Sequence, residues 1–160
     1  MVSRQQRLDE VARLARTGAG TGATALEADV ARPSTTRAPI PGGRGAEVLD
    51  PDAMVAWVDA YYNHADSADL ADSPAPELAG LLRRHLELGG RRIPGERLLS
   101  IVPRPAELDS AGSTLVQLVT DDHPFLVDSV AMELSRQEWS LRRLLHPQLR
   151  VRRDADGRLQ

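Results

Sequence analysis

TLVQLVTDDHPFLVDSVAMELSRQE, residues 114–138, decides the fold class, because it joins a pattern typical of a strand to one typical of a helix. Residues 114–120 are mostly apolar, which indicates a strand in a central position of its sheet. Residues 124–138 place apolar side chains at helical spacing and predict an amphipathic helix. The buried face of this helix is expected to carry Leu126, Val127, Val130, Ala131 and Leu134.

The residues that follow predict a second strand. Residues 141–153, LRRLLHPQLRVRR, alternate between apolar and polar side chains, which is the period of a half-buried strand. Pro147 cannot donate a backbone hydrogen bond, so it favours an edge strand or a bulge at His146. The apolar side is expected to hold Leu141, Leu145, Leu149 and Val151, and the polar side Arg142, His146, Gln148, Arg150 and Arg152.

A hairpin turn is predicted for residues 154–157, DADG, with Asp156 and Gly157 at its centre. Strand, helix, strand and turn together form the first half of a βαββαβ, ferredoxin-like module. The chain ends at Gln160, three residues after this turn. Because a hairpin with one strand cannot satisfy its backbone groups, we expect the second strand to continue in a longer protein.

Upstream of this module the sequence predicts a helical hairpin and one more strand. Its first helix begins with Asp50 as N-cap and Pro51 at the first helical position, and runs to about residue 64. The second helix begins near Pro76, and Gly89–Gly90 end it. Residues 97–103, RLLSIVP, read as a strand.

Residues 1–49 have a different character. Residues 4–16 predict a short amphipathic helix, which is expected to be stable only against a partner. Residues 17–49 are rich in glycine and proline without a sustained period, so they predict a flexible, disordered arm. Residues 18–23 loosely match a dinucleotide-binding loop, but no buried strand precedes them and no helix opens there, so a linker is the better interpretation.

Composition excludes several kinds of chemistry. The chain has no cysteine, and all 20 of its basic residues are arginine. Disulfides, thiolate metal sites and lysine Schiff bases are therefore excluded, and a reducing cytoplasm fits the absence of cysteine. No apolar run is long enough to span a membrane. Although residues 134–160 are locally basic, the arginine side of residues 141–153 carries no aromatic residue for base stacking, so nucleic acid is not an expected partner.

Two blocks carry a specific resemblance. TDDHPFLVDSVAMELSRQ (120–137) and RRLLHPQLRVRRDADGRL (142–159) resemble the N-terminal ACT-type region of the large NAD-specific glutamate dehydrogenases of bacteria. WVDAYYNHADSADL (57–70) and RRIPGERLLSIVPRP (91–105) are similar to the stretches that precede that region. The resemblance covers about residues 50–160, and residues 1–49 have no counterpart in it.

The chain is therefore expected to be α+β, with a short helix and flexible, disordered arm over 1–49, a helical hairpin over 50–96, and a truncated ACT-like module over 97–160. The resemblance implies a parent enzyme that converts L-glutamate and NAD to 2-oxoglutarate, ammonia and NADH. Its catalytic domain would lie far C-terminal, so this segment is expected to have no catalytic residue and no bound cofactor or metal. Its partners would be downstream domains, further copies of itself and an amino-acid effector. The alternative is a free-standing ACT-type amino-acid sensor.

The strand-to-helix corner is where ACT modules typically bind amino acids, often across a dimer interface. The resemblance therefore implies a ligand or interface site at Asp121, Asp122, His123, Pro124 and Phe125. Phe125 stands where the ACT pattern D-x-P-G-L has glycine. The residues by themselves favour a role in starting the helix, with Asp122 as cap and Pro124 in the first turn. Ligand or interface contacts are the second interpretation, and metal ligands are the third. Phe125 is expected to be a buried anchor.

Overall fold

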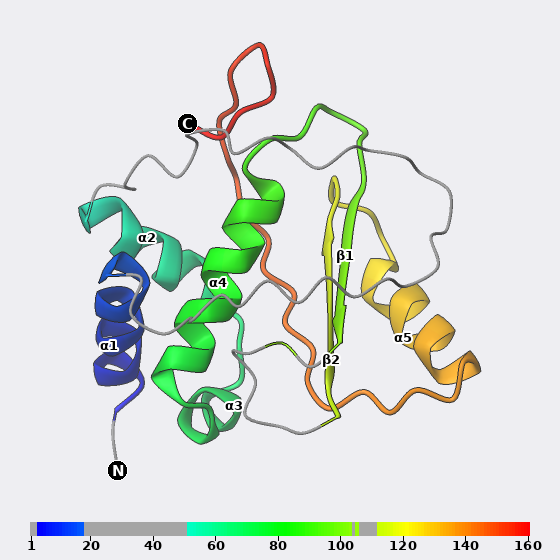
Figure 1. Ribbon diagram of the computed structural model, residues 1–160, viewed down its shortest axis with the longest axis horizontal. Helices are drawn as coiled ribbons and strands as arrows, with labels where there is room; N and C mark the ends of the chain where they lie inside the picture. The colour runs from blue at the N-terminus through cyan, green and yellow to red at the C-terminus, as the bar shows by residue number, and fades with distance from the viewer. Residues whose placement is uncertain (1–2, 18–50, 104, 106–111) are drawn as a thin grey trace.

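A computed structural model of the chain describes residues 3–17, 51–103, 105 and 112–160. Helices and strands of this part form an α+β fold, as predicted (Figure 1). The predicted flexible arm beyond Thr17, the glycine motif at residues 18–23 and the Asp50 cap lie outside the described residues. The elements in chain order are α1 (Arg4–Thr17), α2 (Pro51–Tyr62), α3 (Ser67–Asp72), α4 (Ala75–Gly89), β1 (Leu98–Pro103), β2 (Thr114–Val119) and α5 (Leu126–Arg136).

Helix α1 confirms the predicted amphipathic helix and finds its partner within the same chain. Its apolar stripe is buried against α2, α3 and α4. Arg4 strengthens this contact, because its guanidinium donates to the backbone oxygens of Tyr62 (2.6 Å), the last residue of α2, and of Ala65 (3.1 Å), just beyond it. The Tyr62 oxygen, which also accepts the Ala65 backbone N–H at 3.1 Å, lies at the C-terminal end of the helix, where positive charge is favourable.

The predicted helical hairpin is present as α2 and α4, with a helix between them that was not predicted. Helix α3 is short and is capped by Asp66, whose carboxylate accepts the N–H of Ala68 at 2.7 Å. Tyr62 is fully buried, and its hydroxyl donates to the Leu78 backbone oxygen at 2.6 Å. Helix α4 ends at Gly89, where a glycine stop was predicted. This four-helix group contains the main hydrophobic core.

Strands β1 and β2 form an antiparallel pair, with Leu98 opposite Val119 and Pro103 opposite Thr114. Both strands contact α4, but only Gln117 of β2 is buried. The predicted central position of β2 is not seen among the described residues, because β1 is the one strand that pairs with it there. His85 of α4 joins the helices to the sheet: its Nδ1 lies 2.7 Å from the Tyr61 hydroxyl, and its ring also hydrogen-bonds to the Leu118 backbone.

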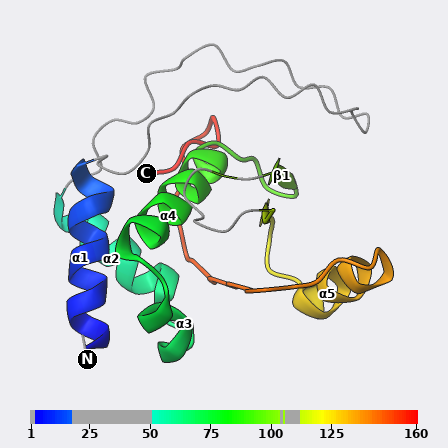
Figure 2. The same cartoon turned by 60° about the horizontal axis from the view of Figure 1, so that its bottom comes forward.

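Residues 141–153 form no ladder-paired strand, so this prediction is wrong. The segment is extended and crosses below α4 and β2 without hydrogen bonds to a neighbouring strand in the described ranges (Figure 2). Half-buried and exposed side chains still alternate along the segment. Leu145 and Leu149 pack on the helical core, while His146, Gln148 and Arg150 are exposed. Leu141 and Val151 were expected to be buried and are exposed instead. A bulge is an irregularity of a paired strand, so the bulge predicted at His146 is absent as well.

The segment is held by side chains and by its end. Arg143 pairs with Glu77 of α4 at 2.6 Å. The predicted hairpin turn is present, but its centre is Ala155–Asp156, and Gly157 follows with a φ of 78°. Gly157 N–H donates to the Asp154 backbone oxygen at 3.0 Å. Short bridges at Arg153–Leu159 and Arg91–Arg158 then fix the chain end against the loop after α4.

Helix α5 stands apart from the other helices, at the far side of the sheet (Figures 1 and 2). It is shorter than predicted, and none of its residues is buried. The predicted apolar face is present but only half-buried, at Leu126, Val127, Val130, Ala131 and Leu134. Among the described elements, α5 makes no extensive contact with another helix or strand.

Candidate functional site

The corner between β2 and α5 comprises residues 120–125, and the five predicted site residues lie there. Strand β2 ends at Val119, and α5 begins at Leu126 with Phe125 as its N-cap residue. These five residues are consecutive, so they lie together at the corner, and their role as a site stays a prediction. The structure gives them unequal roles.

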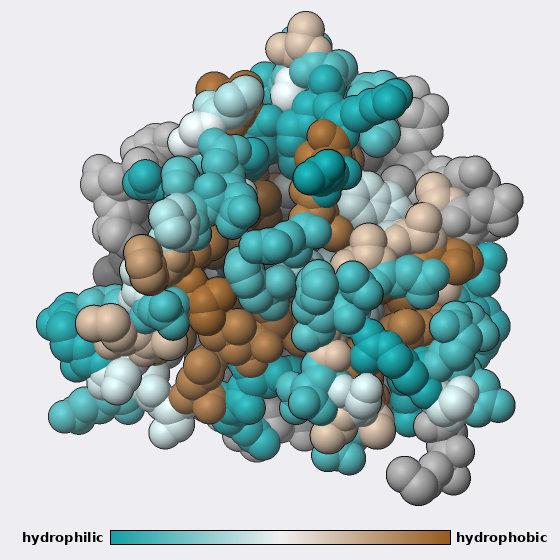
Figure 3. Space-filling view, turned by 180° about the vertical axis from the view of Figure 1, so that it is seen from behind, coloured by the Kyte–Doolittle hydropathy of each residue, from teal (hydrophilic) through white to brown (hydrophobic). Residues whose placement is uncertain are grey.

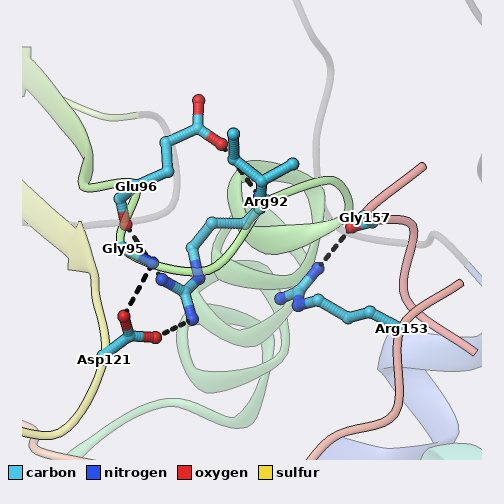
Figure 4. Close-up of polar contacts among 7 residues, drawn as sticks. Arg92, Gly95, Glu96, Asp121, Arg153 and Gly157 are labelled. Atoms are coloured by element: carbon cyan, nitrogen blue, oxygen red, sulfur yellow. Dashed lines mark hydrogen bonds and ion pairs between the residues drawn. The ribbon is translucent and has the colours of Figure 1, made fainter. Parts of the chain in front are cut away.

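Asp121 joins the corner to the loop between α4 and β1 (Figure 4). Its carboxylate pairs with the Arg92 guanidinium and also accepts the Gly95 backbone N–H at 2.8 Å. The hydrogen bond from Arg92, followed by the one from Gly95, lowers the pKa of Asp121 below its ordinary value. Both partners stabilise the charged carboxylate, so Asp121 is ionised at neutral pH and holds the start of the corner in place.

Asp122, His123 and Pro124 are exposed. Asp122 was predicted to cap the helix, but the N-cap residue is Phe125, which makes no side-chain capping hydrogen bond. Pro124 was predicted to lie in the first helical turn, and it lies in the turn that precedes the helix. Both expectations fail for the same reason: the helix starts later, and Phe125 takes the N-cap position.

Phe125 is not the buried anchor that was predicted. Its side chain is 76% exposed, and its φ is 61°. This left-handed backbone conformation is favourable for glycine and costs other residues roughly 1–2 kcal/mol. The backbone at Phe125 therefore has the conformation that glycine favours, while the side chain is a large apolar ring that points to solvent.

A hollow of about 460 Å³ opens beside the ring. It is lined by the corner, by the first residues of α5, and by His146 and Gln148 of the extended segment. The sequence placed these two side chains on the polar side of residues 141–153 but gave no sign that they face the corner. Only the path of the segment past α5 brings them there.

A larger cavity of about 1380 Å³ lies between α4, β2, α5 and the extended segment. Apolar side chains gather on this face of the molecule, beside α5 (Figure 3). The half-buried face of α5 contributes Leu126, Val130 and Leu134 to the lining, and the sheet contributes Val116 and Leu118. The weak packing of α5 follows from this open space.

The residues of the corner can form contacts and hydrogen bonds. Within residues 3–17, 51–103, 105 and 112–160, no group of three or more histidine, aspartate or glutamate side chains could hold a metal ion. In the same part of the chain, none of the helices is long and apolar enough to cross a membrane.

Comparison with protein families gives a match over most of the chain. The family described as "Glutamate dehydrogenase, ACT1 domain" matches residues 57–160, from α2 to the end of the chain. The matched range includes the corner, the extended segment and most of the helical group. No solved structure matches the chain.

Proposed function

Because this chain belongs to the glutamate dehydrogenase ACT1 domain family, we propose that it is a regulatory and assembly segment of an NAD-dependent glutamate dehydrogenase. The parent enzyme would convert L-glutamate and NAD to 2-oxoglutarate, ammonia and NADH. The family match over residues 57–160 carries the proposal. The coarser part of it, an ACT-type domain associated with glutamate dehydrogenase, follows directly from that match.

We propose that the segment itself is not catalytic. The chain has no lysine and no cysteine, so it cannot supply the active-site lysines that the resemblance implies for the wider superfamily. NAD would bind elsewhere in the parent enzyme. A cytoplasmic location completes this part of the proposal, since a chain without cysteine needs no oxidising compartment.

The corner is proposed to act as a contact surface for another domain or another copy of the enzyme. A phenylalanine that is 76% exposed and adopts a left-handed backbone conformation is unfavourable in the isolated chain on both counts. Burial of the ring against a partner would recover roughly 1.5–3 kcal/mol of hydrophobic free energy. An amino-acid effector in the hollow beside His146 and Gln148 is the second use of the same corner, because the exposed ring leaves that hollow open.

Activity measurements test the first part of the proposal. The purified 160-residue chain should not reduce NAD in the presence of L-glutamate, whereas the full-length gene product should do so. Parallel assays with NADP test the cofactor. Turnover by the chain alone that survives repurification would contradict the non-catalytic role. A full-length product without glutamate dehydrogenase activity would favour a free-standing sensor.

Substitution of Phe125 tests the contact surface. In the full-length protein, Phe125→Ser should weaken oligomer assembly, measured by light scattering after size-exclusion chromatography, or change the response to added amino acids. Met132→Ser is the matched control, because Met132 is also exposed, at 72%, but lies on α5 outside the hollow. Equal behaviour of both variants in both assays would remove the corner from the proposal. The division into residues 1–49, 50–96 and 97–160 also stays a prediction, which limited proteolysis can test.

A further inference from the structure

Two arginines from distant parts of the chain meet at the edge of the large cavity (Figure 4). Arg92 lies in the loop that follows α4, and Arg153 lies just before the C-terminal turn. The backbone oxygen of Gly157 connects them, because it accepts the Arg92 backbone N–H at 2.9 Å and a guanidinium N–H of Arg153 at 3.0 Å. The corner hollow described above does not include either arginine.

Arg92 uses most of its donors within the protein. Its Nη2 pairs with Asp121, and its Nη1 donates to the Glu96 backbone oxygen at 2.9 Å. Its side chain is only 12% exposed, and its Nε is buried without an acceptor in the part of the chain that the structure describes. Arg92 therefore acts as a fixed positive charge whose position is set by Asp121.

Arg153 is far less satisfied. Only its Nη1 has an acceptor among the described residues, and its Nε is buried without one. Asp154, the next residue, does not neutralise it: one of its carboxylate oxygens accepts the backbone N–H groups of Asp156 and Arg158 within the turn. The Nε–H and Nη2–H groups of a guanidinium point in the same direction, and together they match the two oxygens of a carboxylate.

The charges of the pair are also unbalanced. Asp121 offsets Arg92, whereas no acidic side chain of the described residues forms an ion pair with Arg153. Burial and the neighbouring charge of Arg92 lower the pKa of Arg153. A partly buried positive charge without an acidic partner is unfavourable, and an anion that reached the unpaired Nε–H and Nη2–H groups would relieve it.

We propose that Arg153, with Arg92 beside it, binds the carboxylate of a small organic acid that enters from the large cavity. The cavity, about 1380 Å³, is large enough for such a molecule. Val119, Val151 and Leu159 line the same cavity and provide apolar surface for the carbon chain of the acid. The site is independent of the proposed function, because it rests on the two arginines and not on the family of the chain.

Binding measurements on the 160-residue protein test the site. The protein is titrated with sodium glutarate, with sodium L-glutamate and with sodium phosphate at constant ionic strength, by calorimetry and by NMR of the arginine Nε–H signals. At least one of the two carboxylates should bind saturably and shift the Arg153 Nε–H signal. Arg153→Gln should weaken this binding by about tenfold or more, the effect of losing hydrogen bonds to a charged group.

Arg152→Gln is the matched control, because it removes the same charge from the exposed neighbouring residue and should leave the affinity unchanged. Arg153→Lys keeps the charge but removes the two-donor edge, so it should also weaken binding. If Arg153→Gln does not fold, as judged by circular dichroism, the Lys variant and the NMR shifts of the wild-type protein decide. Absence of saturable binding, or an equal loss in Arg152→Gln, would overturn the proposal. Phosphate that binds as tightly as the carboxylates would overturn the assignment to a carboxylate.

Discussion

Phe125, at the start of α5, and Gly157, after the last turn, both have an unusual backbone conformation. Both have a positive φ, but one is phenylalanine and the other glycine. At Gly157 the residue type fits the backbone, and a Cβ atom there would lie 2.7 Å from the Arg92 backbone oxygen. At Phe125 the residue type opposes the backbone, and the ring faces solvent. The fold of the chain therefore accounts for glycine at position 157, but it does not by itself account for phenylalanine at position 125.

Replacement of Phe125 should have little effect on the stability of the isolated chain. Phe125→Ala is expected to change the free energy of unfolding by less than about 1 kcal/mol, as is usual for exposed positions. Phe125→Gly should be more stable than Phe125→Ala by up to about 1 kcal/mol, because glycine adopts the left-handed conformation without a clash. Urea denaturation of the three proteins measures both differences. A loss of about 3 kcal/mol in Phe125→Ala would restore the buried-anchor interpretation.

Gly157→Ala should be strongly destabilising. The left-handed φ and the overlap with Arg92 act together, so we expect a loss of about 2 kcal/mol or more. Gly112→Ala is the matched control, because Gly112 also has a positive φ, of 86°, but a Cβ atom there would meet no atom of the described residues within 4 Å apart from its chain neighbours. That variant should lose only the conformational part, about 1 kcal/mol. Equal losses in urea denaturation would show that the contact with Arg92 is not tight.

Asp121 should make stability depend on pH in the acid range. Its pKa is lower in the folded protein than its ordinary value of 3.8, so folding favours the ionised form. The stabilisation is fully present above the ordinary value and is lost as the pH falls through the lower, folded pKa. Asp121→Asn should therefore lower the urea midpoint at pH 7 and should differ less from wild type near pH 2.

The control for this pH dependence is Asp122→Asn, which removes the same charge from the exposed neighbouring residue. It should shift the midpoint by less than Asp121→Asn at pH 7. If both variants lose the same stability, general charge effects explain the result, and the hydrogen bonds from Arg92 and Gly95 do not.

At the scale of elements, α4 and α5 are both amphipathic, but they differ in what covers them. Helix α4 packs against α1 on one side and the sheet on the other, and six of its residues are buried. Helix α5 borders the large cavity and buries no residue completely. The same sequence pattern therefore gives a core helix in one place and a loosely held helix in the other.

Hydrogen exchange should separate the two helices. Amides of α5 are expected to exchange through local opening, with much weaker protection than amides of α4, because few apolar contacts oppose the opening of α5. Native-state exchange followed by NMR provides the comparison within one sample. Equal protection of both helices would mean that α5 is coupled to the core more strongly than its burial indicates.

At the scale of the whole molecule, the helical group of α1–α4 holds most of the buried apolar side chains. Helix α1 is central to it, because it contacts each of the other three helices. The sheet and α5 extend from this group, and the extended segment returns to it through Leu145, Leu149 and the Arg143–Glu77 pair. Stability of the whole chain should depend first on this group.

Substitution within α1 tests that dependence. Val11→Asn places an amide at a position that is 0% exposed, and it should lower the free energy of unfolding by about 3 kcal/mol or more through lost packing and an unsatisfied polar group. Arg13→Asn is the matched control, since Arg13 is exposed on the same helix. Thermal unfolding followed by circular dichroism measures both. A small effect of Val11→Asn would show that α2–α4 fold without α1.

The sequence by itself determined the local elements and the family. Apolar spacing predicted α1, α2, α4 and α5, and apolar runs predicted β1 and β2, because these patterns depend on near neighbours in the chain. The motif around residues 120–137 and its partner block predicted the ACT-type resemblance, which the family match confirms. The glycine stop of α4 and the position of the last turn also follow from local chemistry, since glycine readily adopts positive φ.

Tertiary structure decided what those elements contact. Alternation in residues 141–153 predicts an extended chain, but a strand also needs a partner edge, and local pattern does not supply one. The exposure of Phe125 depends on whether another element covers the corner, and the meeting of Arg92 with Arg153 joins positions that are far apart in the chain. These contacts arise from packing between distant segments, so spacing along the sequence could place the corner residues together but could not say which of them face solvent, a partner or a cavity.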